Sequence, residues 1–141
     1  MARTYQPNTT LNSIMTFMMA VGVAPKAIQM LTVTGRRSGQ SHSVPISPIT
    51  LDDQLYLVSP YGEVAWVKNV RLNPRVDLGR KKRNRSYQAT ETAPNEAAPV
   101  LQAYLQREKI VRPYFDVSPH SSLEDIEAEA GNHPVFRLTP A

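Results

Sequence analysis

The feature that most constrains this chain is a glycine-flanked basic turn between two segments with strand character. Leu31–Thr34 is a β-branched run and Ser41–Ile46 alternates polar and apolar side chains, so both favour β-strands. Between them the sequence reads Gly35, Arg36, Arg37, Ser38, Gly39, Gln40. Glycines let a backbone approach a ligand closely, and paired guanidinium groups match phosphate oxygens. The stretch therefore predicts either an anion cradle on a β-hairpin or a solvated basic hairpin tip.

The rest of the chain predicts an α+β fold in a single domain over residues 1–141, with a small antiparallel β-barrel and flanking helices. The second strand is expected to run on to Leu51, and a turn at Asp52–Asp53 leads to a third strand, which makes a meander. The later strands are expected at Gln54–Ser59, Arg75–Leu78, Ser86–Thr92 and Val135–Leu138. Helices are expected at about residues 8–22, and at Val64–Leu72, Ala97–Val111 and Ser122–Ala130.

The composition of the chain limits the kinds of metal, cofactor and partner that it is expected to bind. The chain has no cysteine and its three histidines lack ligand spacing, so no metal site is expected. The formal net charge of +4 indicates an anionic partner, either nucleic acid, a membrane surface or a phosphorylated cofactor. The basic run Arg80–Arg85 is either a solvated tip or a surface for a polyanion. It lacks interleaved aromatic residues, and Ser122–Ala130 is acidic, so no nucleic-acid partner is expected.

Two apolar features have both a core interpretation and a ligand-facing interpretation. The predicted N-terminal helix carries methionines, which fill cores or line adaptable binding surfaces, at positions Met15, Met18 and Met19. Trp66 and Asn69 share one face of the predicted middle helix, where the indole is either a core residue or a wall for a flat ring. The apolar stretch Ile14–Pro25 is too short to span a bilayer, so a cytoplasmic location is expected, with weak membrane association left open.

Two stretches together resemble the deazaflavin-dependent nitroreductase family, split β-barrel proteins of actinobacteria that use coenzyme F-420. The first stretch is Leu31–Gln40; the second runs from Tyr56 to Gly62 and continues with Trp66, Asn69 and Asn73–Pro74. Order and gaps match from about residue 31 to residue 92. The resemblance implies hydride transfer from the reduced deazaflavin to an electron-poor, unsaturated apolar small molecule, and it leaves a homodimer open.

The resemblance also implies residue roles. The basic turn would hold the phosphate of the coenzyme, and a loop after the third strand would line its ring. The implied cofactor residues are Gly35, Arg36, Arg37, Ser38, Gly39, His42, Pro60, Tyr61, Gly62, Trp66 and Asn69. His42 stands where several relatives carry arginine. The implied substrate residues are Met15, Met18, Met19, Tyr114 and Phe115, with Tyr114 as a substrate-side group and no catalytic residue assigned.

Two other functions stay open on sequence alone. Split barrels also bind FMN, so a flavin could replace the deazaflavin in the same fold. A basic barrel could also bind an acidic partner without catalysis, which the run Arg80–Arg85 would support.

Overall fold

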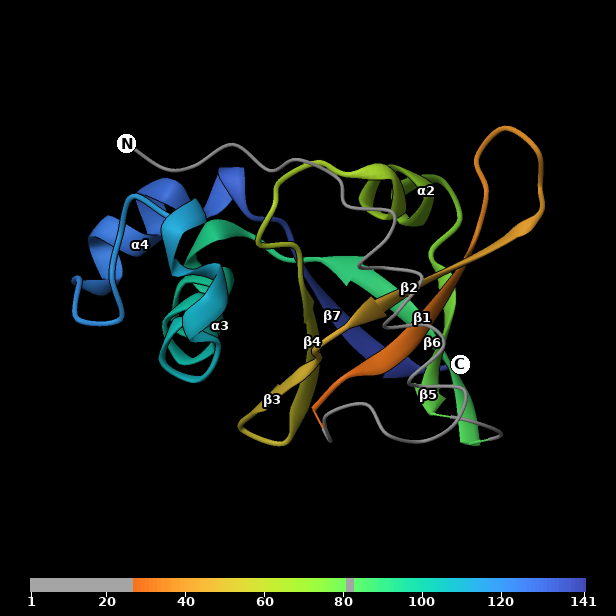
Figure 1. The fold of residues 1–141 in the computed structure, drawn as a ribbon, viewed down its shortest axis with the longest axis horizontal. Helices are drawn as coiled ribbons and strands as arrows, with labels where there is room; N and C mark the ends of the chain where they lie inside the picture. Colours follow the sequence, from red (N-terminus) through yellow and green to blue (C-terminus); the bar gives the residue numbers. More distant parts are fainter. Residues whose placement is uncertain (1–26, 81–82) are drawn as a thin grey trace.

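The computed structural model describes residues 27–80 and 83–141, which form a single antiparallel sheet of seven strands flanked by helices (Figure 1). The strands are β1 (Gln29–Thr34), β2 (Ser41–Ile46), β3 (Ile49–Leu51), β4 (Gln54–Val58), β5 (Arg75–Arg80), β6 (Arg83–Glu91) and β7 (Val135–Pro140). The helices are α2 (Ala65–Leu72), α3 (Pro94–Arg107) and α4 (Leu123–Glu129), with the 3-10 turns η1 (Lys109–Tyr114) and η2 (Ala130–Asn132). The predicted α+β class is confirmed.

The expected N-terminal helix at about residues 8–22 lies outside the described residues. The same holds for three of the expected substrate residues, Met15, Met18 and Met19. The assignment of residues 1–141 to one domain stays a prediction.

The predicted meander is wrong, because the expected second strand is two strands with different partners. β2 pairs with β1 and β3 pairs with β4. The strand order is β2-β1-β5-β6-β7-β4-β3, so β2 and β3 form opposite edges of the sheet. Only Ser47 and Pro48 connect them, and proline, which has no N–H to donate, interrupts a ladder. Two edges joined by so short a link must lie close together, so the sheet curls into a half-barrel.

The expected turn at Asp52 and Asp53 is confirmed. Their φ angles are 51° and 64°, and Leu51 pairs with Gln54, which describes a two-residue hairpin turn with both central residues left-handed. Aspartate tolerates this conformation better than most residues because its short polar side chain bonds locally to the backbone.

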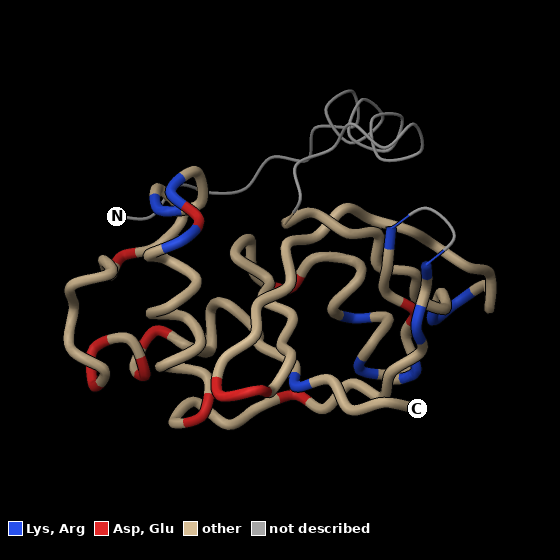
Figure 2. The backbone as a smooth tube through the Cα atoms, turned by 90° about the horizontal axis from the view of Figure 1, so that it is seen from below, with Lys and Arg blue, Asp and Glu red and all other residues tan. Residues whose placement is uncertain are grey.

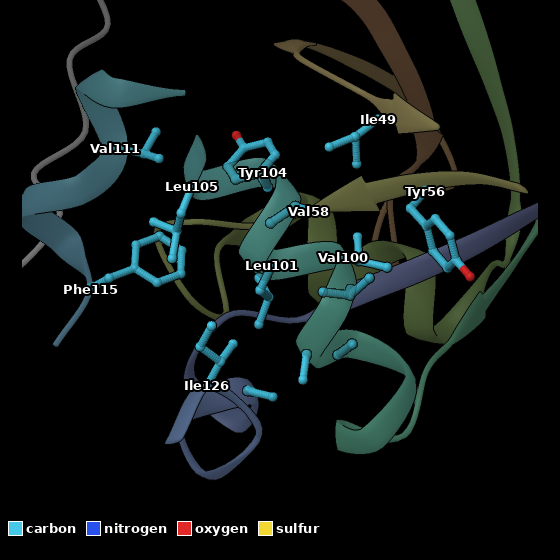
Figure 3. Packing of buried hydrophobic residues seen from close by; sticks show 14 residues of the cluster. Ile49, Tyr56, Val58, Val100, Leu101, Tyr104, Leu105, Val111, Phe115 and Ile126 are labelled. Carbon is cyan, nitrogen blue, oxygen red and sulfur yellow. The ribbon is translucent and has the colours of Figure 1, made fainter. Parts of the chain in front are cut away.

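Alternation along β4 divides the apolar residues into two cores. Tyr56 and Val58 face the helices α3 and α4, whereas Leu57 faces the interior of the curled sheet under α2. In the first core Leu101 and Ile126 pack together between the helices (Figure 3). A strand covered on both faces is expected to be apolar, as β4 is from Leu55 to Val58.

Helix ends follow the local sequence. α2 ends at Leu72, and Asn73 is already non-helical because the following residue, Pro74, disfavours the helical conformation in its predecessor. α4 begins after Ser122, whose hydroxyl accepts from the backbone N–H of Asp125 at 3.1 Å. α3 ends at Arg107 rather than at the predicted Val111, since the chain tightens there into the 3-10 turn η1.

Candidate functional site

The β1–β2 turn and one side of α2 border an open cavity of about 410 Å³. Cavities of roughly 300–1,000 Å³ are typical of small-molecule sites. The lining residues are Val33, Gly35, Arg36, Arg37, Ser38, His42, Ser43, Val44, Ala65, Trp66 and Asn69. The structure therefore brings the predicted basic turn, except Gly39, together with His42 and with the two residues expected from α2.

The turn has a tight local geometry. Gly35 donates to the carbonyl of Gln40 at 2.7 Å, and Gly39 donates to the carbonyl of Gly35 at 3.0 Å. Gly39 has a φ of 71°, a conformation that costs glycine little. A Cβ atom on Gly35 would lie 2.8 Å from Nε2 of His42, so a larger residue there would displace the imidazole.

Asn69 fixes one of the two arginines. Its Oδ1 accepts from the backbone N–H of Arg36 at 3.0 Å and from Nη1 of Arg36 at 2.8 Å. Asn69 is only 5% exposed, so α2 holds the guanidinium group from within the protein. Arg37 is exposed and makes no hydrogen bond or ion pair within residues 27–80 and 83–141. The cradle thus combines one oriented cation with one that is free to bind.

Trp66 contributes to both the cavity and the core. It is 9% exposed, and its ring centroid lies 5.7 Å from that of Phe136 in the core under α2. It also lines the cavity. The two interpretations of this indole are therefore compatible, since one side of the ring packs inward while another borders the open space.

The loop Pro60–Gly62 and Tyr114 do not line this cavity; they form a second group of predicted residues. The rings of Tyr61 and Tyr114 meet edge to face with centroids 4.9 Å apart. The hydroxyl of Ser59 donates to the carbonyl of Gly62 at 2.5 Å, which closes the loop. The loop leads into α2, whose first residues line the cavity, so the two groups are neighbours along the chain. The remaining expected substrate residue, Phe115, is buried in the core between α3 and α4.

Sequence reasoning missed a buried polar network behind this loop. Nδ1 of His133 lies 2.9 Å from the carbonyl oxygen of Pro60, and Nε2 lies 2.7 Å from Oε2 of Glu129. Both side chains are buried. The available signal was the spacing of Glu129 and His133, four positions apart at the end of a predicted acidic helix, although α4 ends at Glu129 and His133 follows the 3-10 turn η2.

Charge is unevenly distributed over the molecule. Figure 2 shows many basic residues at the end that carries β5, β6 and the β1–β2 turn and a second basic group at the opposite end near η1, while most acidic residues lie on the side of α3 and α4. Among the described residues, no group of three or more potential metal ligands occurs. No described helix is long and apolar enough to cross a bilayer. The field at the basic end favours an anionic ligand.

An ion pair braces α2 beside the cavity. Arg71 donates to Glu91 of β6 from Nε at 2.9 Å and from Nη2 at 2.8 Å. These hydrogen bonds to Glu91 raise the pKa of Arg71, so the guanidinium stays charged. The pair ties the C-terminal end of α2 to the sheet, and α2 in turn carries Asn69 and Trp66.

Solved structures of related shape define the fold class. A NimC/NimA family protein from Clostridium acetobutylicum aligns with a TM-score of 0.54 at 17% identity, over 80% of this chain and 73% of that chain. An F420-H2 dependent reductase, FDR-A, aligns with a TM-score of 0.57 at 20% identity, over 81% and 95%. A domain-swapped dimer aligns with a TM-score of 0.61 at 17% identity, over 95% and 100%. The fold is that of the split β-barrel class, as the resemblance implied.

A family model assigns the chain to one family within this fold class. The model described as F420H(2)-dependent quinone reductase matches residues 9–117. The chain belongs to this family of oxidoreductases, which confirms the resemblance to deazaflavin-dependent enzymes. The family name implies dependence on the reduced deazaflavin. A comparison with curated protein sequences finds no match.

Proposed function

We propose that this protein binds reduced coenzyme F-420 at the β1–β2 cavity and transfers a hydride to an electron-poor, unsaturated apolar small molecule of the quinone class. The observation that carries the proposal is the donor set of the cavity. Arg36 is held by Asn69, Arg37 is free within the described residues, and the small Gly35 lets His42 and Ser38 lie close against the turn.

The residues present fit a phosphorylated cofactor. The coenzyme carries a phosphate group and an oligoglutamate tail, and charge-assisted bonds from guanidinium groups to phosphate are stronger than neutral ones. His42 and Ser38 border the same cavity and add polar groups next to the two arginines. The basic end of the molecule (Figure 2) suits the carboxylates of the tail, where exposed pairs add about 0–1 kcal/mol each.

The role of the protein in the reaction is to bind and orient. When bound, the reduced deazaflavin supplies the hydride, and the polypeptide supplies position and exclusion of water. Trp66 offers a flat apolar wall at the cavity, and the loop Pro60–Gly62 lies just before it in the chain. Tyr114, which contacts Tyr61, remains the proposed substrate-side group. The acceptor takes up the hydride and a proton and becomes the two-electron-reduced product.

A titration of the purified protein with coenzyme F-420 and, separately, with FMN tests the proposal. Fluorescence reports the binding of each compound. We expect tight binding of the deazaflavin and weak or no binding of FMN. Turnover of a soluble quinone by the reduced coenzyme then checks the acceptor class. Tight FMN binding alone would replace the cofactor, and binding of neither would favour a basic barrel with an acidic partner.

We also propose a homodimer and a cytoplasmic location. One structure of similar fold is described as a domain-swapped dimer. Within the described residues, β2 and β3 are the edge strands and each pairs with one neighbouring strand only, which leaves backbone groups for pairing with a second copy. Light scattering on the purified protein measures the mass directly, and a monomer at all concentrations would contradict the dimer.

A further inference from the structure

The buried network behind the loop Pro60–Gly62 has a definite proton count. A backbone carbonyl oxygen only accepts, so Nδ1 of His133 must carry a proton and donate it to Pro60. The contact between Nε2 and Glu129 then requires a further proton, either on the imidazole or on the carboxyl group. A neutral imidazole facing a carboxylate would place a lone pair against an anion. The pair therefore holds one proton more than a neutral histidine and an ionised glutamate.

The same glutamate also holds the chain after η1. The backbone N–H of Asp116 donates to Oε1 and Oε2 of Glu129 at 3.0 and 3.1 Å. The ring of Phe115 stacks on the imidazole of His133 with a centroid separation of 3.7 Å and an interplanar angle of 17°. Both side chains of the pair are nearly inaccessible, with exposed fractions of 5% and 9%. Their hydrogen bonds are therefore costly to lose, because water cannot replace them.

These contacts form a closed series of interactions that includes Tyr61 and Tyr114, two of the residues expected to contact the cofactor or the substrate. Pro60 precedes Tyr61, whose ring contacts Tyr114. Tyr114 stands two residues before Asp116, which bonds to Glu129, and Glu129 returns through His133 to Pro60. The pair thus connects the loop after β4 with the segment after η1 from the inside. Displacing either partner would change how Tyr61 meets Tyr114.

We infer that Glu129 and His133 share one proton beyond the one that His133 donates to Pro60, and that this pair positions the loop Pro60–Gly62 against the segment carrying Tyr114. These are positioning residues, since the pair acts through the loop and not on the ligand. The effect on the cofactor rests on the proposed function, in which this loop lines the deazaflavin. The role of the pair in positioning the loop does not depend on the proposed function.

Two variants of Glu129 and one control distinguish a role in positioning the loop from a role in the overall stability of the fold. In Glu129→Gln the amide oxygen can accept from Asp116 and the amide N–H can donate to a neutral imidazole. The hydrogen bonds of this side chain to Asp116 and His133 therefore survive without the extra proton. In Glu129→Ala both contacts are lost. Tyr56→Phe is the matched control, because it removes a hydroxyl that donates to Glu96 at 3.0 Å within the same apolar core but away from the loop.

The readouts are nuclear Overhauser contacts between the rings of Tyr61 and Tyr114, nitrogen-15 spectra of the His133 ring, and the affinity for coenzyme F-420. We expect wild type and Glu129→Gln to keep the ring contact and to agree in affinity within about twofold. Glu129→Ala should lose the ring contact and bind about tenfold more weakly, the loss typical of an unsatisfied buried group. Tyr56→Phe should lower the melting temperature and leave both readouts unchanged.

Either of two results overturns the inference. A bare Nδ1 in wild-type His133 contradicts the proton count, and this measurement needs no variant, so it decides even if Glu129→Ala does not fold. A folded Glu129→Ala protein with the ring contact and the affinity intact contradicts the positioning role. Failure of wild type to bind coenzyme F-420 would instead count against the proposed function, and the ring contacts would still decide the role of the pair.

Discussion

The turn Gly35–Gly39 and the loop Pro60–Gly62 are both expected to contact the cofactor, yet the protein holds them in opposite ways. The turn is exposed from Arg37 to Gly39 and closes on itself through short-range hydrogen bonds, with one buried anchor at Asn69. The loop is fixed from behind by residues more than 70 positions further along, through His133 and through the carbonyl of Pro134, which accepts from Ser59 at 2.8 Å. An anion cradle needs free donors at the surface, whereas a loop that sets a ring in place needs a rigid support.

The largest effect is expected at Trp66, which lines the cavity beside the turn and follows the loop closely in the chain. Trp66→Ala should lower the free energy of unfolding by about 3–5 kcal/mol, because a large buried ring is replaced by a cavity. Chemical denaturation measures this loss. The affinity of the folded protein for coenzyme F-420 should fall as well. A loss of stability with unchanged affinity would show that the indole serves only the core.

The next effect concerns the cradle itself. The double variant Arg36→Ala, Arg37→Ala should weaken binding of coenzyme F-420 about a hundredfold, since two charge-assisted bonds of about 1.5 kcal/mol each are lost. Fluorescence titration measures the change. Lys68→Ala is the control, because this exposed lysine lies on α2 and does not line the cavity. Unchanged affinity in the folded double variant would remove the cradle assignment.

A smaller effect is expected from the single anchor of the turn. Asn69→Ala should weaken binding about tenfold, because Arg36 loses the acceptor that orients it. Asn69→Asp keeps an acceptor for Arg36 but adds a negative charge beside the bound phosphate, so it should bind no better than Asn69→Ala while retaining stability. Tight binding by Asn69→Ala would mean that the turn needs no support from α2.

The smallest effect concerns the ion pair between Glu96 of α3 and Arg137 of β7, away from both regions. Hydrogen bonds from Arg137, and secondarily from Tyr56, hold the pKa of Glu96 below its ordinary value. A carboxyl group with a lowered pKa stabilises the fold at pH values above its unfolded pKa, and this contribution is lost as the pH falls through its folded pKa. We expect a loss of at most about 1 kcal/mol, because the pair is partly exposed. Denaturation at pH 7 and pH 3 should show a shallower dependence for Glu96→Gln; an equal slope would contradict it.

Local sequence patterns predicted the turn at Gly35, the Asp52–Asp53 hairpin and the end of α2, because each depends on neighbouring residues. The separation of β2 from β3 was missed, since strand pairing is a long-range property and only Pro48 marked the break. Glu129 and His133 were missed for the same reason. His133 contacts the carbonyl of Pro60 and Glu129 accepts from the backbone N–H of Asp116, and both of these partners are backbone groups that carry no residue-specific signal.

The most direct test of the account is to follow the backbone amide signals by NMR while coenzyme F-420 is added. If one cofactor contacts both regions, the signals of Arg37 and Ser38 in the turn and of Tyr61 and Gly62 in the loop should shift together with a single dissociation constant. Shifts confined to the turn, or two groups of residues with different dissociation constants, would contradict a shared cofactor site.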